Sequence, residues 1–159
     1  MTLCIAGIDC GITGGLAFYF PSRPDLISVE DIPAAGGVID AVTLAQRLEQ
    51  LKPDFCIIEA VGAMPGQGVS STFKFGVTYG IIRGVVLTCR VPTYLVTPGK
   101  WKRYYNLSAD KDEARAAAIS FWPSSTHFAR KKDHNRAEAA LLARYGAEVI
   151  ARKIAGDAA

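Results

Sequence analysis

Two acidic residues stand where strand-like segments end, and together they could bind a metal ion. Asp9 ends the apolar run 3–9, and Glu59 ends the apolar run 55–59. Such short runs bounded by turn residues are typical of buried strands, inside which an unpaired charge costs roughly several kcal/mol. Sites in open α/β sheets lie at the carboxyl ends of strands, and carboxylates are preferred ligands of Mg²⁺. The pattern therefore favours a shared metal site, with turn capping as the alternative role for Asp9.

A further group of chemically active residues lies near the C-terminus, at the start of a helix predicted from Ala137 onward. His134 and Glu138 are four residues apart and can share one helical face. The apolar neighbours of Glu138 predict that it is buried, and a buried acid needs a partner such as a metal ion. Asp133 could join this site, or it could fold back and cap the helix.

Basic residues are concentrated in one part of the chain. Segment 100–136 contains 9 Lys or Arg and 4 Asp or Glu, whereas segment 1–99 contains 6 and 8. Because the net charge is only +3, this clustering indicates a surface for a polyanion. Residues 100–105 also place three aromatic rings among three cations, which fits phosphate contacts beside stacking surfaces. Phe73 and Lys74 form a similar pair, for which core packing of the ring is the alternative.

These side chains need a scaffold of strands and helices. We predict strands at 3–9, 16–20, 26–32, 55–59 and 91–96, and helices at 38–51, 69–88, 109–121 and from 137 onward. The first three strands follow one another directly, which predicts an antiparallel meander. Loops are expected at 34–37 and 60–68, and a turn at 97–99.

The helix predicted at 69–88 contains a regular series of glycines, and a Ser or Thr near its start should cap it. Gly76, Gly80 and Gly84 recur every four residues and so share one face. Each costs up to about 1 kcal/mol of helix stability relative to alanine. Close packing on the sheet is the favoured explanation, and a self-complementary dimer contact is the alternative.

Length and composition favour a globular cytoplasmic protein with a single domain over residues 1–159. Half of the residues are hydrophobic, which excludes a disordered chain. We expect no signal peptide, because no basic region precedes an apolar stretch near the N-terminus. We also expect no membrane association, because no apolar run reaches the ~18 residues that a bilayer span requires. The four cysteines are scattered without a C-x-x-C pair, which indicates reduced thiols.

Three motifs together resemble the RuvC family of Holliday junction resolvases in the RNase H-like superfamily, over residues 3–145. The first is Gly7-Ile8-Asp9 with the glycines at 11, 14 and 15, a pattern that sugar-kinase and actin-like ATPases share. The second is Ile57-Ile58-Glu59 followed by segment 63–76, and the third is segment 131–139, KKDHNRAEA. The second and third are specific in combination, and they resemble especially the phage-type and prophage-type branch.

The resemblance implies an α/β, RNase H-like fold with a mixed five-stranded sheet flanked by helices. It also implies a homodimer that holds a four-way or branched DNA junction and nicks two strands symmetrically, in the cytoplasm of a bacterial host. Two Mg²⁺ ions per active site, with Mn²⁺ as a substitute, would lie roughly 4 Å apart and catalyse phosphodiester hydrolysis.

The resemblance assigns roles to individual residues. Asp9, Glu59 and Glu138 match the three metal-binding acids, with Asp9 expected to bridge both ions. Bacterial members have a further acid three residues before the last one, where this sequence has Asn135. Asp133 is the first candidate for this fourth ligand, and His134, which could also help to deprotonate the water, is the second. The expected DNA contacts are Gln67, Phe73, Lys74, Lys100, Lys102, Arg103, Lys131 and Lys132.

Three other functions remain as alternatives. A nuclease of the same superfamily could act on another branched substrate or on RNA, and a junction-binding protein could bind without cutting. The three acids argue against a non-cleaving protein. An actin-like or sugar-kinase ATPase needs two lobes and a far longer chain.

Overall fold

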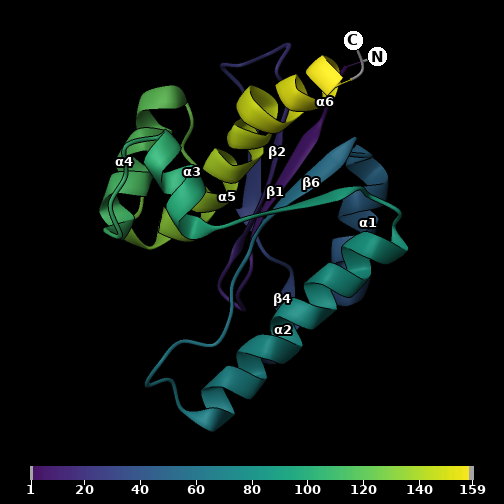
Figure 1. Ribbon diagram of the computed structural model, residues 1–159, viewed down its shortest axis with the longest axis vertical. Coiled ribbons are helices and arrows are strands. Elements are labelled where there is room, and N and C mark those ends of the chain that lie inside the picture. Colours follow the sequence, from purple (N-terminus) through teal and green to yellow (C-terminus); the bar gives the residue numbers. More distant parts are fainter. Residues whose placement is uncertain (1, 158–159) are drawn as a thin grey trace.

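The computed structural model describes residues 2–157, which form a mixed five-stranded sheet with helices on both faces (Figure 1). The strand order is β3-β2-β1-β6-β7. Central β1 pairs antiparallel with β2 and parallel with β6, and β2 pairs antiparallel with β3. The predicted fold class and the predicted meander are therefore confirmed. The strands are β1 (Ile5–Asp9), β2 (Gly15–Tyr19), β3 (Ile27–Asp31), β6 (Phe55–Glu59) and β7 (Thr93–Val96).

The two faces of the sheet are covered by different helices, because alternate strand residues point to opposite sides. Ile8 and Ile58 pack with residues of α1 (Ala41–Leu51) and α2 (Val69–Thr88). Ile5 and Ile57 belong to the core on the other face. That core is completed by α3 (Pro98–Tyr104), α4 (Lys111–Phe121) and α5 (His134–Tyr145), and the chain continues through a π-helical turn (Gly146–Ile150) into α6 (Ala151–Asp157).

Helix α5 lies unusually close to the sheet, and two glycines allow this approach. A Cβ atom added to Gly7 of β1 would lie 2.2 Å from the carbonyl oxygen of Ala139. A Cβ added to Gly15 of β2 would lie 2.6 Å from the carbonyl oxygen of Asn135. Both distances are impossible for a real side chain, so the backbone of α5 occupies the space that side chains of β1 and β2 would fill.

Several element bounds shift by one or two residues, and three parts of the chain differ more from the sequence-based expectation. Val38–Ile39 is strand β5, paired with β4 (Ala34–Ala35), and α1 starts after Asp40, whose carboxylate accepts a hydrogen bond from the Thr43 N–H at 3.0 Å. Segment 98–104 is helix α3 rather than the continuation of a turn, with Pro98 in the first helical turn, where its missing N–H costs nothing. Helix α5 begins at His134, directly after a 3₁₀ turn (Lys131–Asp133), rather than at Ala137.

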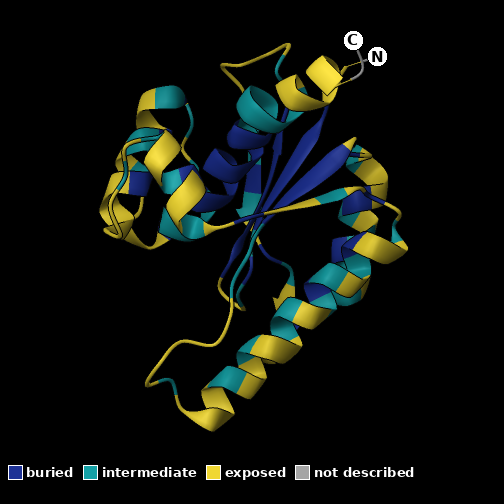
Figure 2. Cartoon of the chain, viewed as in Figure 1, coloured by how far each residue is buried: buried dark blue, intermediate teal, exposed yellow. Residues whose placement is uncertain are grey.

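Helix α2 has the predicted bounds, but two interpretations of it were wrong. Its N-cap is Gly68, with no side-chain hydrogen bond, rather than a Ser or Thr. A Cβ added to Gly76, Gly80 or Gly84 would meet no atom within 4 Å, so these glycines do not serve close packing on the sheet. The N-terminal half of α2 projects beyond the sheet and is largely exposed (Figure 2).

The remaining expectations concern the thiols and the membrane. All four cysteines are free, as predicted. Burial raises the pKa of the Cys4 thiol to about 12, which keeps it protonated at neutral pH. Within residues 2–157, no helix combines the length and the apolar character that crossing a bilayer requires.

The packing of α5 predicts opposite effects for two Gly-to-Ala substitutions. Gly7→Ala should lower the free energy of unfolding by about 1–3 kcal/mol or more, because the new methyl group overlaps the α5 backbone. Gly80→Ala, where the new methyl group meets no neighbouring atom of the same chain, should raise the free energy of unfolding of the monomer by roughly 0.5–1 kcal/mol through helix propensity. Urea unfolding followed by circular dichroism measures both. Equal effects of the two substitutions would contradict the close approach at Gly7.

Candidate active site

The parallel pairing of β1 and β6 brings the first two predicted acids together. The register pairs Ile8 with Ile58, so that Asp9 and Glu59 are the next residues on adjacent strands. Both therefore stand at the carboxyl edge of the sheet, as the sequence pattern predicts. The loop after β6 is rich in glycine, and the turn after β1 is closed by a hydrogen bond from the Gly14 N–H to the Gly11 carbonyl.

Glu138 approaches the same edge from α5. Its residue surface is 8% exposed, and it lies between Ala137 and Ala139, which are both fully buried. Glu138 and Glu59 both raise the pKa of Asp9, which shows that the three carboxylates are electrostatic neighbours. The glycines that admit α5 to the sheet are therefore also what brings Glu138 to the strand acids.

The three carboxylates repel one another in a partly dehydrated place. Burial, followed by the charges of Glu138 and Glu59, raises the pKa of Asp9 well above its ordinary value, and Lys111 opposes this rise. Burial also raises the pKa of Glu59, an effect that a hydrogen bond from Trp101 partly offsets. A cation placed among them would relieve this repulsion and favour the ionised forms.

Two side chains of α3 contact two of the three carboxylates. The indole N–H of Trp101 donates a hydrogen bond to Glu59 Oε2 over 2.6 Å, and Lys102 Nζ lies 3.7 Å from Glu138 Oε1. In this arrangement, no three His, Cys, Asp or Glu side chains within residues 2–157 converge closely enough to hold a metal ion. The donor chemistry nevertheless suits a hard divalent cation, because all three groups are carboxylates.

The structure gives Asp133 partners other than the three acids. Its side chain is 2% exposed, and its carboxylate accepts hydrogen bonds from the Arg130 backbone N–H at 2.8 Å and from the Arg130 guanidinium at 2.8 Å. Arg136 lies 3.9 Å away. Burial raises the pKa of Asp133, but the hydrogen bonds and charges of these arginines outweigh it, and the pKa lies below its ordinary value. These contacts favour a structural role for Asp133.

The neighbouring residues of the third motif have distinct surroundings. His134 Nδ1 lies 3.3 Å from the Lys131 carbonyl oxygen, and His134 shares the face of α5 that carries Glu138. The side-chain amide of Asn135 donates to the Thr13 carbonyl over 2.5 Å and ties the start of α5 to the turn after β1. The role of His134 as the fourth ligand stays a prediction.

The predicted DNA contacts fall into two groups. Lys131 and Lys132 border hollows of about 540 Å³ that are also lined by Lys111 and His134, while Lys102 and Arg103 border another of about 510 Å³. Lys100 lies on the same helix, α3. Among these basic residues, Lys102 lies 3.7 Å from Glu138 Oε1, and Lys111 lowers the pKa of Asp9. Gln67, Phe73 and Lys74 are instead on the projecting loop and first turns of α2 (Figure 1).

Sequence reasoning missed two residues at this site. The sequence pattern places Trp101 only among the aromatic residues of segment 100–105, and Lys111 only within the helix predicted at 109–121. A tryptophan beside a lysine gives no local signal that it will meet a carboxylate 42 residues away. The aromatic and basic residues at 100–105 indicate contacts with DNA rather than with a carboxylate of the same chain.

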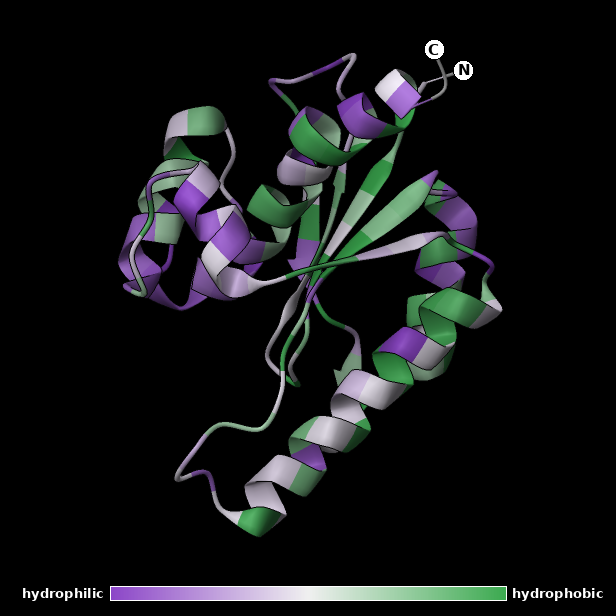
Figure 3. Ribbon diagram, viewed as in Figure 1, coloured by the Kyte–Doolittle hydropathy of each residue, from purple (hydrophilic) through white to green (hydrophobic). Residues whose placement is uncertain are grey.

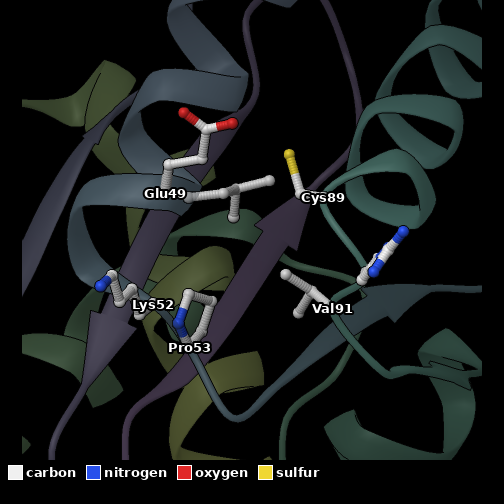
Figure 4. A pocket seen from close by; sticks show the side chains of 7 residues that line it. Glu49, Lys52, Pro53, Cys89 and Val91 are labelled. Carbon is white, nitrogen blue, oxygen red and sulfur yellow. The ribbon is translucent and has the colours of Figure 1, made fainter.

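A separate pocket of about 300 Å³ lies between the ends of α1 and α2 (Figure 4). Pro53 and Val91, which line it, precede β6 and β7, so the pocket is at the sheet edge opposite to the carboxylates. Cys89 also lines it, and burial and the charge of Glu49 raise the pKa of its thiol. A protonated thiol is a poor nucleophile, so this pocket adds no chemistry to the candidate site.

The contacts of Asp133 predict its effect on stability in the absence of divalent metal. Asp133→Asn should lower the free energy of unfolding by about 1–3 kcal/mol, because two arginines lose their buried charged partner. Asp31→Asn, the matched control, removes the exposed partner of Arg136 and should cost less than about 1 kcal/mol. Thermal unfolding in EDTA compares the two. A stabilised Asp133→Asn protein would instead place Asp133 in the repulsive acid cluster.

Comparison with known proteins identifies the fold. No known protein-family profile matches the sequence, and no curated protein is significantly similar to it. Among solved structures, Thermus thermophilus RuvC in complex with a Holliday junction substrate aligns with a TM-score of 0.69 and 18% sequence identity, covering 91% of this chain and 94% of that one. A second Thermus thermophilus RuvC structure aligns with a TM-score of 0.61 and 15% identity over 92% and 96%. Nearly the whole chain therefore has the fold of RuvC.

Proposed function

We propose that this protein is a metal-dependent endonuclease that resolves four-way or branched DNA junctions. The observation that carries the proposal is that Asp9, Glu59 and Glu138 are electrostatic neighbours at one edge of the sheet, in a chain with the fold of RuvC. The structurally similar RuvC has been solved with a Holliday junction substrate. The motifs at 57–76 and 131–139 support the same assignment at the level of sequence, including the phage-type or prophage-type branch.

The three carboxylates would hold the metal, with His134 or Asp133 as a further ligand. Mg²⁺, or Mn²⁺ in its place, would supply charge stabilisation at the scissile phosphate and an acidified water, and a pair of ions is the arrangement we propose. His134 stands one helical turn before Glu138 and can accept a proton from that water. Lys111 lies close enough to Asp9 to lower its pKa and would face the same phosphate.

The surface around the carboxylates suits a polyanion. Lys102 and Arg103 border one hollow, and Lys111 and Lys132 border another. In this proposal, a DNA backbone would contact these basic residues on its way to the three acids. Lys102 would exchange its contact with Glu138 for a phosphate once a divalent cation neutralised that acid. The action on DNA would take place in the cytoplasm of a bacterial host.

We propose that the protein acts as a homodimer through the exposed face of α2. This face carries apolar side chains together with the three glycines and is partly hydrophobic in Figure 3. Val69 is 89% exposed and Phe73 is 72% exposed, which is unusual for side chains of this size. Residues four apart on this face could pack against a second copy, and the glycines would let two helices approach closely.

Cleavage of synthetic DNA tests the proposed activity. In Mg²⁺, the wild-type protein should introduce paired nicks into a four-way junction and leave linear duplex intact, and EDTA should abolish the nicks. Asp9→Asn should lose at least about 10³-fold in rate because it removes a ligand shared by the site. Asp9→Asn should also be no less stable than wild type in EDTA, since it relieves the repulsion that raises the pKa of Asp9.

Other substrates in the same assay separate the alternatives. Junction binding without cutting in Mg²⁺ or Mn²⁺ would identify a binding protein rather than a nuclease. Cutting of an RNA–DNA hybrid but not of the junction would keep the metal site and reject the resolvase. Full activity of Asp9→Asn would reject the carboxylate cluster as the catalytic centre.

The proposed dimer predicts a change in molecular mass. Gly80→Trp should convert the dimer to a monomer, because the ring fills the space in which the two helices would meet. Lys74→Trp adds the same ring to another side of α2 and serves as the control. Light scattering coupled to gel filtration measures the mass. An unchanged mass of Gly80→Trp would place the dimer contact elsewhere.

A further inference from the structure

Trp101 reaches the candidate active site from inside the protein core. Its ring is fully buried in the core formed by α3, α4 and α5. The N–H at its edge donates to Glu59 Oε2 over 2.6 Å, which is short for a hydrogen bond from nitrogen. The bond engages one carboxylate oxygen of Glu59 and leaves the other to bind a cation.

The next residue extends this contact to a second acid. Lys102 Nζ lies 5.4 Å from the centre of the Trp101 ring and 3.7 Å from Glu138 Oε1. An ammonium group over an indole face is attracted by the ring electrons. The ring of Trp101 thus contacts the cation that holds Glu138, while its edge holds Glu59. Two acids from β6 and α5 are in this way linked to one short helix, α3.

Core packing alone explains why Trp101 is buried, but it does not explain why its indole N–H donates to a carboxylate. Trp122 provides the comparison within the same chain, because it is equally buried and belongs to the same core. Its indole N–H donates to the backbone carbonyl of Pro24 over 3.1 Å. A buried indole needs an acceptor, and a carbonyl satisfies that need without contacting any of the three acids.

We propose that Trp101 is a positioning residue that fixes the orientation of Glu59 for metal binding and, through Lys102, restrains Glu138. The proposal rests on the proposed metal-dependent function of the site. Groups that orient metal ligands by hydrogen bonds typically contribute 10- to 100-fold to metal affinity. Without the N–H of Trp101, Glu59 could rotate away from Asp9, and each bound cation would have to order it again.

The test compares Trp101→Phe with Trp122→Phe in the full-length protein. Each substitution deletes one buried N–H and keeps an aromatic ring, so both should lower stability by a similar amount. Binding of Mn²⁺, measured directly by electron paramagnetic resonance of the free ion, should weaken roughly 10-fold or more in Trp101→Phe and stay unchanged in Trp122→Phe. The Mg²⁺ concentration that gives half-maximal junction cleavage should shift in parallel, with recovery at high Mg²⁺.

The outcomes separate this proposal from the proposed function. Equal Mn²⁺ affinity in wild type, Trp101→Phe and Trp122→Phe would overturn the positioning role, whatever the substrate of the protein is. Wild-type protein that binds Mn²⁺ but cuts no junction would reject the resolvase, while a weakened Trp101→Phe would still support the positioning role. Equal weakening in both variants would assign the effect to general loosening of the core and would overturn the proposal.

Discussion

The contact between the α5 backbone and the glycines of β1 and β2 is the constraint on which the site depends. No side chain fits between Gly7 and Ala139, or between Gly15 and Asn135. A helix held at ordinary distance from a sheet would carry Glu138 away from Asp9. The two glycines weaken strand propensity locally. They also allow α5 to place Glu138 beside the ends of two strands.

The same closeness creates electrostatic strain. Burial and two neighbouring carboxylates raise the pKa of Asp9. Folding with all three carboxylates ionised is therefore unfavourable. Proteins commonly retain such destabilising groups where function requires them. Lys111, Lys102 and the Trp101 N–H partly compensate the excess negative charge. A charged cluster supported in this way is more readily explained as a ligand site than as part of a stabilising core.

Some basic side chains around the site form ion pairs within the fold, and others line its surface. Arg130 and Arg136 are engaged by Asp133 and Asp31, and they hold the start of α5 in place. Lys111 and Lys132 instead line open hollows. The charge count of residues 100–136 therefore overstates the positive charge available to a polyanion, because part of the basic segment is engaged within the fold.

Local patterns in the sequence determined the five strands of the main sheet, the bounds of α2, the ends of α1 and α4, and the places of two acids at strand ends. Apolar runs ending in Asp9 and Glu59, and the helical spacing of 69–88, depend on residues close in the chain, where burial and periodicity leave a visible pattern. The partners of Trp101, Asp133 and Asn135 were decided only by the tertiary structure. Trp101 and Glu59 are 42 residues apart, and Asn135 and Thr13 are 122 apart, so that only the packing of α3 and α5 onto the sheet brings them together. Hydrogen bonds of this kind depend on distance and direction in space, which residue type and spacing along the chain do not encode.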